Sequence, residues 1–145
     1  MTLTLPTTGT IAPWMRAATV YQPPLAGGST TQIYGGSVLG MMDMAMDLNN
    51  VYLAEATSNQ ILSTGANGGA AILVASANDP FGIALSGASL YWTNYGNGSV
   101  KKVATTGGVK TTIATGQLNP GFIAVDTTCV HWTEPGGGTV KKANK

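Results

Sequence analysis

The sequence contains one histidine and one cysteine, His131 and Cys129, and these limit the chemistry it can perform. A Ser-His-Asp triad could be built only around His131, and no Gly-x-Ser-x-Gly turn accompanies it. His131 stands where Tyr52 and Tyr91 stand in two similar segments, so the position favours aromatic packing over proton transfer. Cys129 cannot form an internal disulfide, and without a Cys/His cluster around it a zinc site has no ligand set, so we interpret it as a small buried hydrophobe. We predict no catalytic residue.

Carboxylates at matching positions offer a second kind of chemistry. Glu55 and Glu134 are equivalent in two of these segments, so they could approach a common axis and hold a calcium-like cation. Calcium takes six or more oxygen ligands, and two carboxylates are too few. Asp47 and Asp126 are also equivalent, and their place after a short apolar run predicts side chains that cap a turn by accepting bonds from local amides. We therefore predict no metal site and no cofactor.

A larger group of polar residues falls at turns, where rigid strands would position them for binding. We expect them on one loop face, formed by the loops between second and third strands and by the connections between repeated units. The predicted ligand-binding residues are Glu55, Asp79, Asn94, Tyr95, Asn119 and Glu134, with Ser58 and Asn97 beside them. The alternative interpretation is an ordinary solvated rim of turn-forming residues.

The elements that position these residues repeat along the chain. "MAMDLNNVYLAE" (44–55), "IALSGASLYWTN" (83–94) and "IAVDTTCVHWTE" (123–134) align without a gap. Apolar and polar residues alternate with a period of two between Gly and Asn turns, which predicts four short strands per unit. In one unit we expect strands at 82–86, 89–94, 99–104 and 109–115, with Trp92 and the equivalent Trp132 in the core. Four antiparallel strands in about 40 residues, repeated in tandem, are typical of a β-propeller blade.

These units define an all-β chain with about three blades. We expect an N-terminal extension at 1–18 and propeller repeats at 19–145, made of a partial blade 19–36, blades 43–76 and 82–115, and a partial blade 122–142. The first partial blade aligns with third and outer strands, and the last supplies inner, second and third strands. Three blades cannot close a ring by themselves, so strand edges and apolar faces would stay exposed.

The second strands carry a motif that resembles a known family. "YWTN" (91–94), "HWTE" (131–134) and the degenerate "YLAE" (52–55) resemble the YWTD repeat of six-bladed propellers of the low-density-lipoprotein-receptor and TolB-like type. "PFGIA" (80–84) is similar to that family's approach to the inner strand, whereas "PGFI" (120–123) departs from it. Bacterial propeller repeat proteins of unknown function are closer in pattern. The resemblance implies a six-bladed ring, although the fourth motif position is never Asp here.

Three blades in the chain and six in the family that it resembles are compatible with two arrangements. We predict a homodimer that closes a six-bladed ring, in which each composite blade combines the start of one chain with the end of the other. The alternative is that the chain is a piece of a longer propeller.

Charge limits the partners. Charged residues make up 9% of the chain and its formal net charge is +1, so no strong field would gather nucleic acid or an anionic membrane. The N-terminus lacks a basic leader, so we do not expect a signal peptide. No apolar run of 18 residues occurs, so we do not expect a membrane span. The scarcity of charge and abundance of Thr and Gly suit an exported protein, yet the compartment stays undetermined.

The predicted function is that of a non-catalytic binding module, which takes a protein, peptide or glycan on the loop face around the central channel. The first alternative is a propeller enzyme of the lactonase or lyase kind, which needs carboxylate, Asn and His residues converging on the channel mouth. The second alternative is an orphan structural repeat without a ligand.

Overall fold

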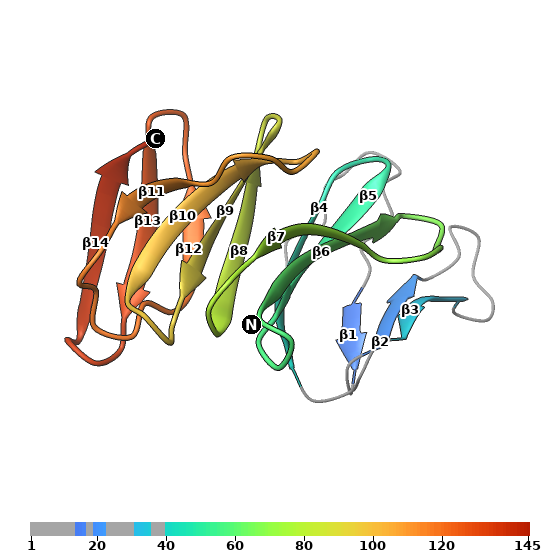
Figure 1. Ribbon diagram of the computed structural model, residues 1–145, viewed down its shortest axis with the longest axis horizontal. Helices are drawn as coiled ribbons and strands as arrows, with labels where there is room; N and C mark the ends of the chain where they lie inside the picture. Colours follow the sequence, from blue (N-terminus) through green and yellow to red (C-terminus); the bar gives the residue numbers. More distant parts are fainter. Residues whose placement is uncertain (1–13, 17–18, 23–30, 36–39) are drawn as a thin grey trace.

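Antiparallel strands form four sheets that follow one another in chain order (Figure 1). The computed structural model describes residues 14–16, 19–22, 31–35 and 40–145. Within this part of the chain no helix occurs, and so none is long and apolar enough to cross a membrane. The predicted all-β class, with blades of four antiparallel strands and about three blades in the chain, is confirmed.

Each sheet is built from strands that are neighbours in sequence. The N-terminal sheet contains β1 (Trp14–Arg16), β2 (Thr19–Gln22) and β3 (Thr31–Gly35). The first blade contains β4 (Met41–Met46), β5 (Asn50–Glu55), β6 (Gln60–Gly65) and β7 (Ile72–Ser76). The second blade contains β8 (Pro80–Ser86), β9 (Ser89–Asn94), β10 (Ser99–Ala104) and β11 (Thr111–Ala114). The C-terminal sheet contains β12 (Ile123–Val125), β13 (Cys129–Glu134) and β14 (Thr139–Asn144).

The strand positions agree closely with the expected ones in the second blade. The outer strand β11 is shorter than expected, because Gly107 and Gly108 take φ values of 85° and 108° and Val109 remains 92% exposed ahead of the pairing. In the N-terminal sheet, β1 pairs with β2 from Trp14↔Tyr21 onward. The expected extension therefore includes one strand of that sheet, and residues 1–13 and 17–18 of it lie outside the described residues.

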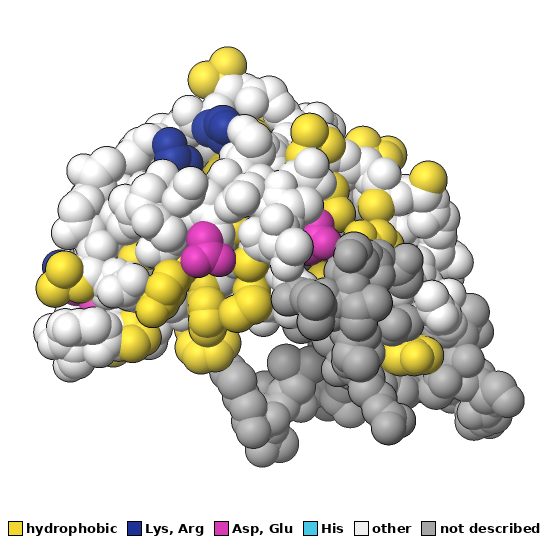
Figure 2. Space-filling view, turned by 60° about the horizontal axis from the view of Figure 1, so that its bottom comes forward, with side chains coloured by type: hydrophobic (Ala, Val, Ile, Leu, Met, Phe, Trp, Pro, Cys, Tyr) yellow, Lys and Arg dark blue, Asp and Glu magenta, His cyan; other side chains and the backbone are white. Residues whose placement is uncertain are grey.

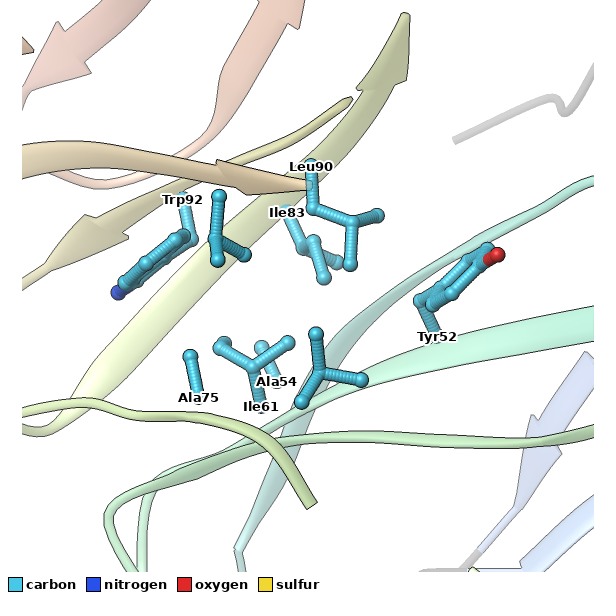
Figure 3. Packing of buried hydrophobic residues seen from close by; sticks show 9 residues of the cluster. Tyr52, Ala54, Ile61, Ala75, Ile83, Leu90 and Trp92 are labelled. Carbon is cyan, nitrogen blue, oxygen red and sulfur yellow. The ribbon is translucent and has the colours of Figure 1, made fainter. Parts of the chain in front are cut away.

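The sheets are held together by apolar layers between their faces. Side chains alternate across a strand, so β9 sends Leu90 and Trp92 toward the first blade and Tyr91 toward the C-terminal sheet. Figure 3 shows Trp92, Leu90 and Ile83 facing Ala54, Ile61 and Ala75 across one such layer. The other layers contain Val20, Ile33, Val51, Leu53 and Leu62 on one side of the first blade, and Tyr91, Val100, Val130 and Trp132 beyond the second blade.

Both expected core tryptophans are buried, Trp92 completely and Trp132 to all but 3%. Burying a valine, leucine, isoleucine, phenylalanine or methionine side chain contributes about 1.5–3 kcal/mol. Each layer takes residues from two neighbouring sheets. No sheet of the described chain therefore buries its apolar faces alone.

The inner strands approach one another most closely at Gly82. A Cβ at this position would lie 2.7 Å from the Gly121 carbonyl oxygen and 2.9 Å from the Ile123 amide nitrogen, both backbone atoms of the next sheet. Thr93 bridges the same place, because its Oγ1 accepts the Gly82 amide (2.9 Å) and donates to the Gly121 carbonyl (2.6 Å). The missing side chain at Gly82 lets β8 and the start of the C-terminal sheet meet.

We predict that Gly82→Ala destabilises the fold by about 1–3 kcal/mol, because backbone atoms must move to accept the methyl group. Chemical denaturation measures the change. Gly137→Ala is the matched control, since a Cβ there finds its nearest atom at 3.5 Å. Equal stability of the two variants would contradict the packing described at Gly82.

Candidate functional site

The six predicted binding residues lie at the same end of the sheets, at the bottom of Figure 1, and this end is the loop face. The structure divides them into two groups. Glu55, Asn94 and Glu134 are buried, with exposed fractions of 5%, 1% and 2%. Asp79, Tyr95 and Asn119 are exposed. The buried group ends the second strands, and the exposed group belongs to the connections and turns around them.

Asn94 binds three separate pieces of the second blade. Its Oδ1 accepts the amide of Asn78 (2.8 Å), in the connection that enters the blade, and the indole Nε1 of Trp92 (2.9 Å). Its Nδ2 donates to Ser99 Oγ (2.9 Å) at the start of the third strand. The side chain therefore fixes the position of the loop that leads into the inner strand.

Glu134 plays the equivalent part in the C-terminal sheet. Its Oε1 accepts the amide of Leu118 (3.1 Å), in the incoming connection, while its Oε2 accepts Thr139 Oγ1 (3.2 Å) and lies 2.9 Å from Lys141 Nζ. The hydrogen bond from Lys141 is the main cause that holds the pKa of Glu134 below its ordinary value, with help from the Leu118 amide. Glu55 accepts the hydroxyl of Ser58 in the corresponding turn. The fourth motif position thus organises the loop face with an amide or a carboxylate.

Asp79 and Asn119 occupy equivalent places, each directly before a proline that leads into an inner strand. Both have positive φ, 48° and 53°, and so does Asn59 at 57°. All three positive-φ residues other than glycine in the described chain lie on the loop face. Backbone strain of this kind clusters at functional sites. Asn59 Oδ1 accepts the Asp79 amide (2.6 Å), and the Asp79 carbonyl accepts the Tyr95 amide (2.9 Å).

An aromatic cluster stands among these polar groups. Phe81 lies 5.2 Å from Phe122, edge to face at 79°, and 6.0 Å from Tyr95, measured between ring centroids. Tyr95 is 38% exposed and Phe122 is 49% exposed. In Figure 2, which brings the lower end of Figure 1 forward, hydrophobic side chains gather below the middle of the face, next to an acidic side chain. The sequence analysis included Tyr95 and missed both phenylalanines, because the rings come from β8, the β9–β10 turn and the connection before β12.

Asp43 is a second residue that the sequence analysis missed. It is half-buried on the inner strand β4, where its Oδ2 accepts the Ile83 amide of the second blade (3.0 Å) and its Oδ1 accepts the Met44 amide (2.9 Å). Burial raises the pKa of Asp43, and the two amides oppose that rise. The available sequence signal was an acid inside an inner strand, at the position of Gly82 in the next unit.

The opposite end of the sheets holds the predicted turn caps. Asp47 Oδ1 accepts the amides of Asn49 and Asn50 at 2.8 Å, and Asp126 Oδ1 accepts those of Thr128 and Cys129 at 2.7 Å. Capping by both aspartates is confirmed. Hydrogen bonds hold the pKa of Asp126 well below its usual range. The bond from the Cys129 amide lowers this pKa most, and a side-chain bond with His131 is the next largest cause.

The expectation that Cys129 has no ligand-type neighbours is wrong. Asp126, Cys129 and His131 bring one carboxylate oxygen, one sulfur and one imidazole nitrogen within 4.8 Å of one another. Cys129 is half-buried rather than buried. The signal was present in the sequence, because Cys129 and His131 are two residues apart on one strand and therefore share a face.

Comparison with known proteins identifies the fold. No family model matches this chain, and no curated protein sequence matches it. Its structure is similar to a propeller in a nidogen/laminin complex (18% identity, TM-score 0.83, 94% of this chain and 57% of that chain). It is also similar to virginiamycin B lyase from Staphylococcus aureus (15% identity, TM-score 0.65, 88% of this chain and 49% of that chain). A third similar structure is the computationally designed Ika4 protein (13% identity, TM-score 0.75, 92% of this chain and 84% of that chain).

The chain therefore consists of β-propeller blades, and it spans about half the length of the matched chains in the nidogen/laminin complex and in the lyase. Propellers serve unrelated functions, so the function must be argued from the residues of this chain.

We predict that Glu134→Gln lowers stability at neutral pH and that this difference from the wild type disappears in acid. The folded pKa of Glu134 lies below its ordinary value of 4.5. Its charged form therefore stabilises the fold above that pH, and the contribution is lost as the pH falls through the lowered folded pKa. Chemical denaturation across the acid range measures the difference.

Asp79→Asn is the control, because it removes a carboxylate of the same face that makes no side-chain hydrogen bond among the described residues. A Glu134→Gln difference that stayed constant down to the acid limit would contradict the ion pair with Lys141.

Proposed function

We propose that this chain is a non-catalytic binding module that takes a protein or peptide ligand on its loop face. The observation that carries the proposal is the aromatic cluster of Phe81, Tyr95 and Phe122, two of whose rings are partly exposed. Aromatic side chains dominate the energy of protein interfaces, because they bury a large area with little loss of conformational freedom.

Polar groups around the cluster suit the rim of such an interface. Asp79 and Asn119 are exposed at equivalent positions, each with positive φ directly before a proline, and the backbone of Asp79 is held by hydrogen bonds with Asn59 and Tyr95. They can accept or donate hydrogen bonds from positions that vary little, which favours binding because few degrees of freedom are lost. Leu118, 56% exposed, extends the apolar part of the face beside Asn119.

The nidogen/laminin complex supports a protein ligand, since that structure pairs a similar propeller with another protein. The lyases support the alternative of an enzyme, and one similar structure is a form of virginiamycin B lyase made inactive by replacing a histidine with alanine. This chain has a single histidine, and His131 contacts Asp126 at the end of β13 opposite to the loop face. A binding role therefore fits the loop face better than a histidine-dependent reaction.

We further propose that two copies complete a six-bladed ring. The face of the C-terminal sheet that points away from the second blade is uncovered among the described residues: Val140 is 71% exposed, whereas Val100 at the same place in the second blade is completely buried. Thr133 Oγ1 is buried without a hydrogen-bond partner in this part of the chain. Its equivalent, Thr93, donates to the following sheet. Both differences fit a further sheet at this face.

The two three-stranded sheets lack different strands: the C-terminal sheet has no outer strand and the N-terminal sheet has no inner strand among the described residues. The C-terminal sheet has inner, second and third strands and no outer strand among the described residues. In the N-terminal sheet, β3 lies against β6 as β11 lies against β14, which assigns β3 to the outer place. One composite blade can then form from both chains. Because β1 and β13 both occupy the second place, and β2 and β14 both occupy the third, one strand of each pair leaves its present position on assembly.

We predict that Tyr95→Ala and Phe122→Ala each weaken a peptide ligand roughly tenfold or more, the effect of removing an interface hot spot. The ligand is a peptide selected on the wild-type chain from a random displayed library, and fluorescence anisotropy measures its affinity. Leu48→Ala is the control, because Leu48 is 79% exposed in the turn at the opposite end.

Selection of peptides that bind all three variants equally would contradict the loop-face site. A glycan array, probed in parallel, separates the ligand classes: binding there with none in the peptide library would contradict a protein ligand. An absence of binding in both would favour the structural repeat.

We predict that the wild-type chain sediments with twice the mass of one chain and that Val140→Glu sediments as a monomer. A buried carboxylate at the open face would have no partner, and this cost opposes association. Val109→Glu, at a valine that is 92% exposed before β11, is the matched control and stays dimeric. A wild-type chain that remains monomeric at every concentration contradicts ring closure by two copies.

A further inference from the structure

We infer that Asp126, Cys129 and His131 form a binding site for a divalent transition-metal ion of the zinc class. The site lies at the end of the C-terminal sheet opposite to the loop face, so it is independent of the proposed binding function. The three ligand atoms lie within 4.8 Å of one another. Zinc binds carboxylate oxygen, thiolate sulfur and imidazole nitrogen at about 2.0–2.3 Å in a tetrahedron, which places ligand atoms roughly 3.3–3.8 Å apart. Movements of about 1 Å suffice to enclose an ion.

The β12–β13 hairpin holds the ligands in place without a metal. Thr128 and Cys129 donate their amides to Asp126 Oδ1, each at 2.7 Å. This leaves Oδ2, which lies 2.8 Å from His131 Nε2. Cys129 and His131 are two residues apart on β13, so their side chains point to the same face. A carboxylate oxygen and an imidazole nitrogen are therefore oriented toward each other beside the sulfur.

The equivalent turns of the other two blades form without the cysteine and the histidine. In the first blade the same turn is made by Asp47, and Asn50 and Tyr52 stand where Cys129 and His131 stand in the C-terminal sheet. The Tyr52 hydroxyl donates to Asp47 Oδ2 at 2.9 Å, so a tyrosine completes the turn. In the second blade the three positions are Ser86, Ser89 and Tyr91. The hairpin therefore needs neither cysteine nor histidine, and their joint presence in one sheet requires another reason.

The surroundings complete a site with an open coordination position. The thiolate of Cys129 and the carboxylate of Asp126 together carry two negative charges, which balance a divalent cation. Asn144, opposite Cys129, places its Oδ1 3.8 Å from the sulfur and offers an oxygen, with water as the other source. The His131 side chain is 35% exposed, so an ion can enter from solvent.

The test is a cobalt titration of the purified full chain under metal-free conditions. We expect one Co²⁺ per chain, a sulfur-to-cobalt charge-transfer band in the near ultraviolet, and displacement of both by Zn²⁺. Zinc should also slow alkylation of Cys129 by iodoacetamide. Because all three ligands belong to one chain, this stoichiometry is the same in a monomer and in a dimer.

Two variants and a control decide the assignment. Cys129→Ser should lose the charge-transfer band, and His131→Tyr, which installs the residue of the other blades, should weaken binding at least tenfold. Asp79→Asn, at the opposite end, should bind as the wild type does. Circular dichroism establishes that each variant is folded. No charge-transfer band in the wild type, or undiminished binding by folded His131→Tyr, overturns the site.

Discussion

The packing of each sheet against its neighbours is the constraint on which this structure depends. A four-stranded sheet of this size has two apolar faces, and alternation along β9 sends Trp92 to one neighbour and Tyr91 to the other. An isolated blade would leave both faces in water. The chain meets this requirement by repetition, and Val140, 71% exposed, lies on a face that no other sheet of the described residues covers.

Precise loops follow from the packed sheets. Asn94 and Glu134 end their strands completely buried, and each accepts an amide from the connection that leads into its own sheet. Gly82 and Thr93 bring the inner strands together at the same end. The exposed residues of the loop face are therefore attached to a rigid base. The aromatic cluster depends on this base, because Phe122 precedes the C-terminal sheet and contacts Phe81 of the second blade only when the two sheets are packed.

Much of the fold could be predicted from the sequence, because every second residue of a strand lies on its buried face and is apolar, and because the turns contain glycine and asparagine. The β8, β9 and β10 positions and the burial of Trp92 follow from this pattern. The site was harder to predict. Glu55 ends a strand and Tyr95 opens the corresponding turn of the next blade, and only three-dimensional packing determines that Glu55 is buried and Tyr95 is exposed. The contacts between Phe81 and Phe122, and between Asp43 and Ile83, join separate sheets and leave no local pattern. The grouping of Asp126, Cys129 and His131 is local, and it escaped notice because cysteine and histidine were weighed separately.

Hydrogen exchange, measured segment by segment on the native protein, tests the central claim that mutual packing of the sheets holds this fold together. The strands β5 and β9 have an apolar layer on each side, whereas the described part of β14 has one. The account predicts that β5 and β9 exchange most slowly and open together in one cooperative unit. Exchange of β5 and β9 at unrelated rates, or faster than β14, would contradict it.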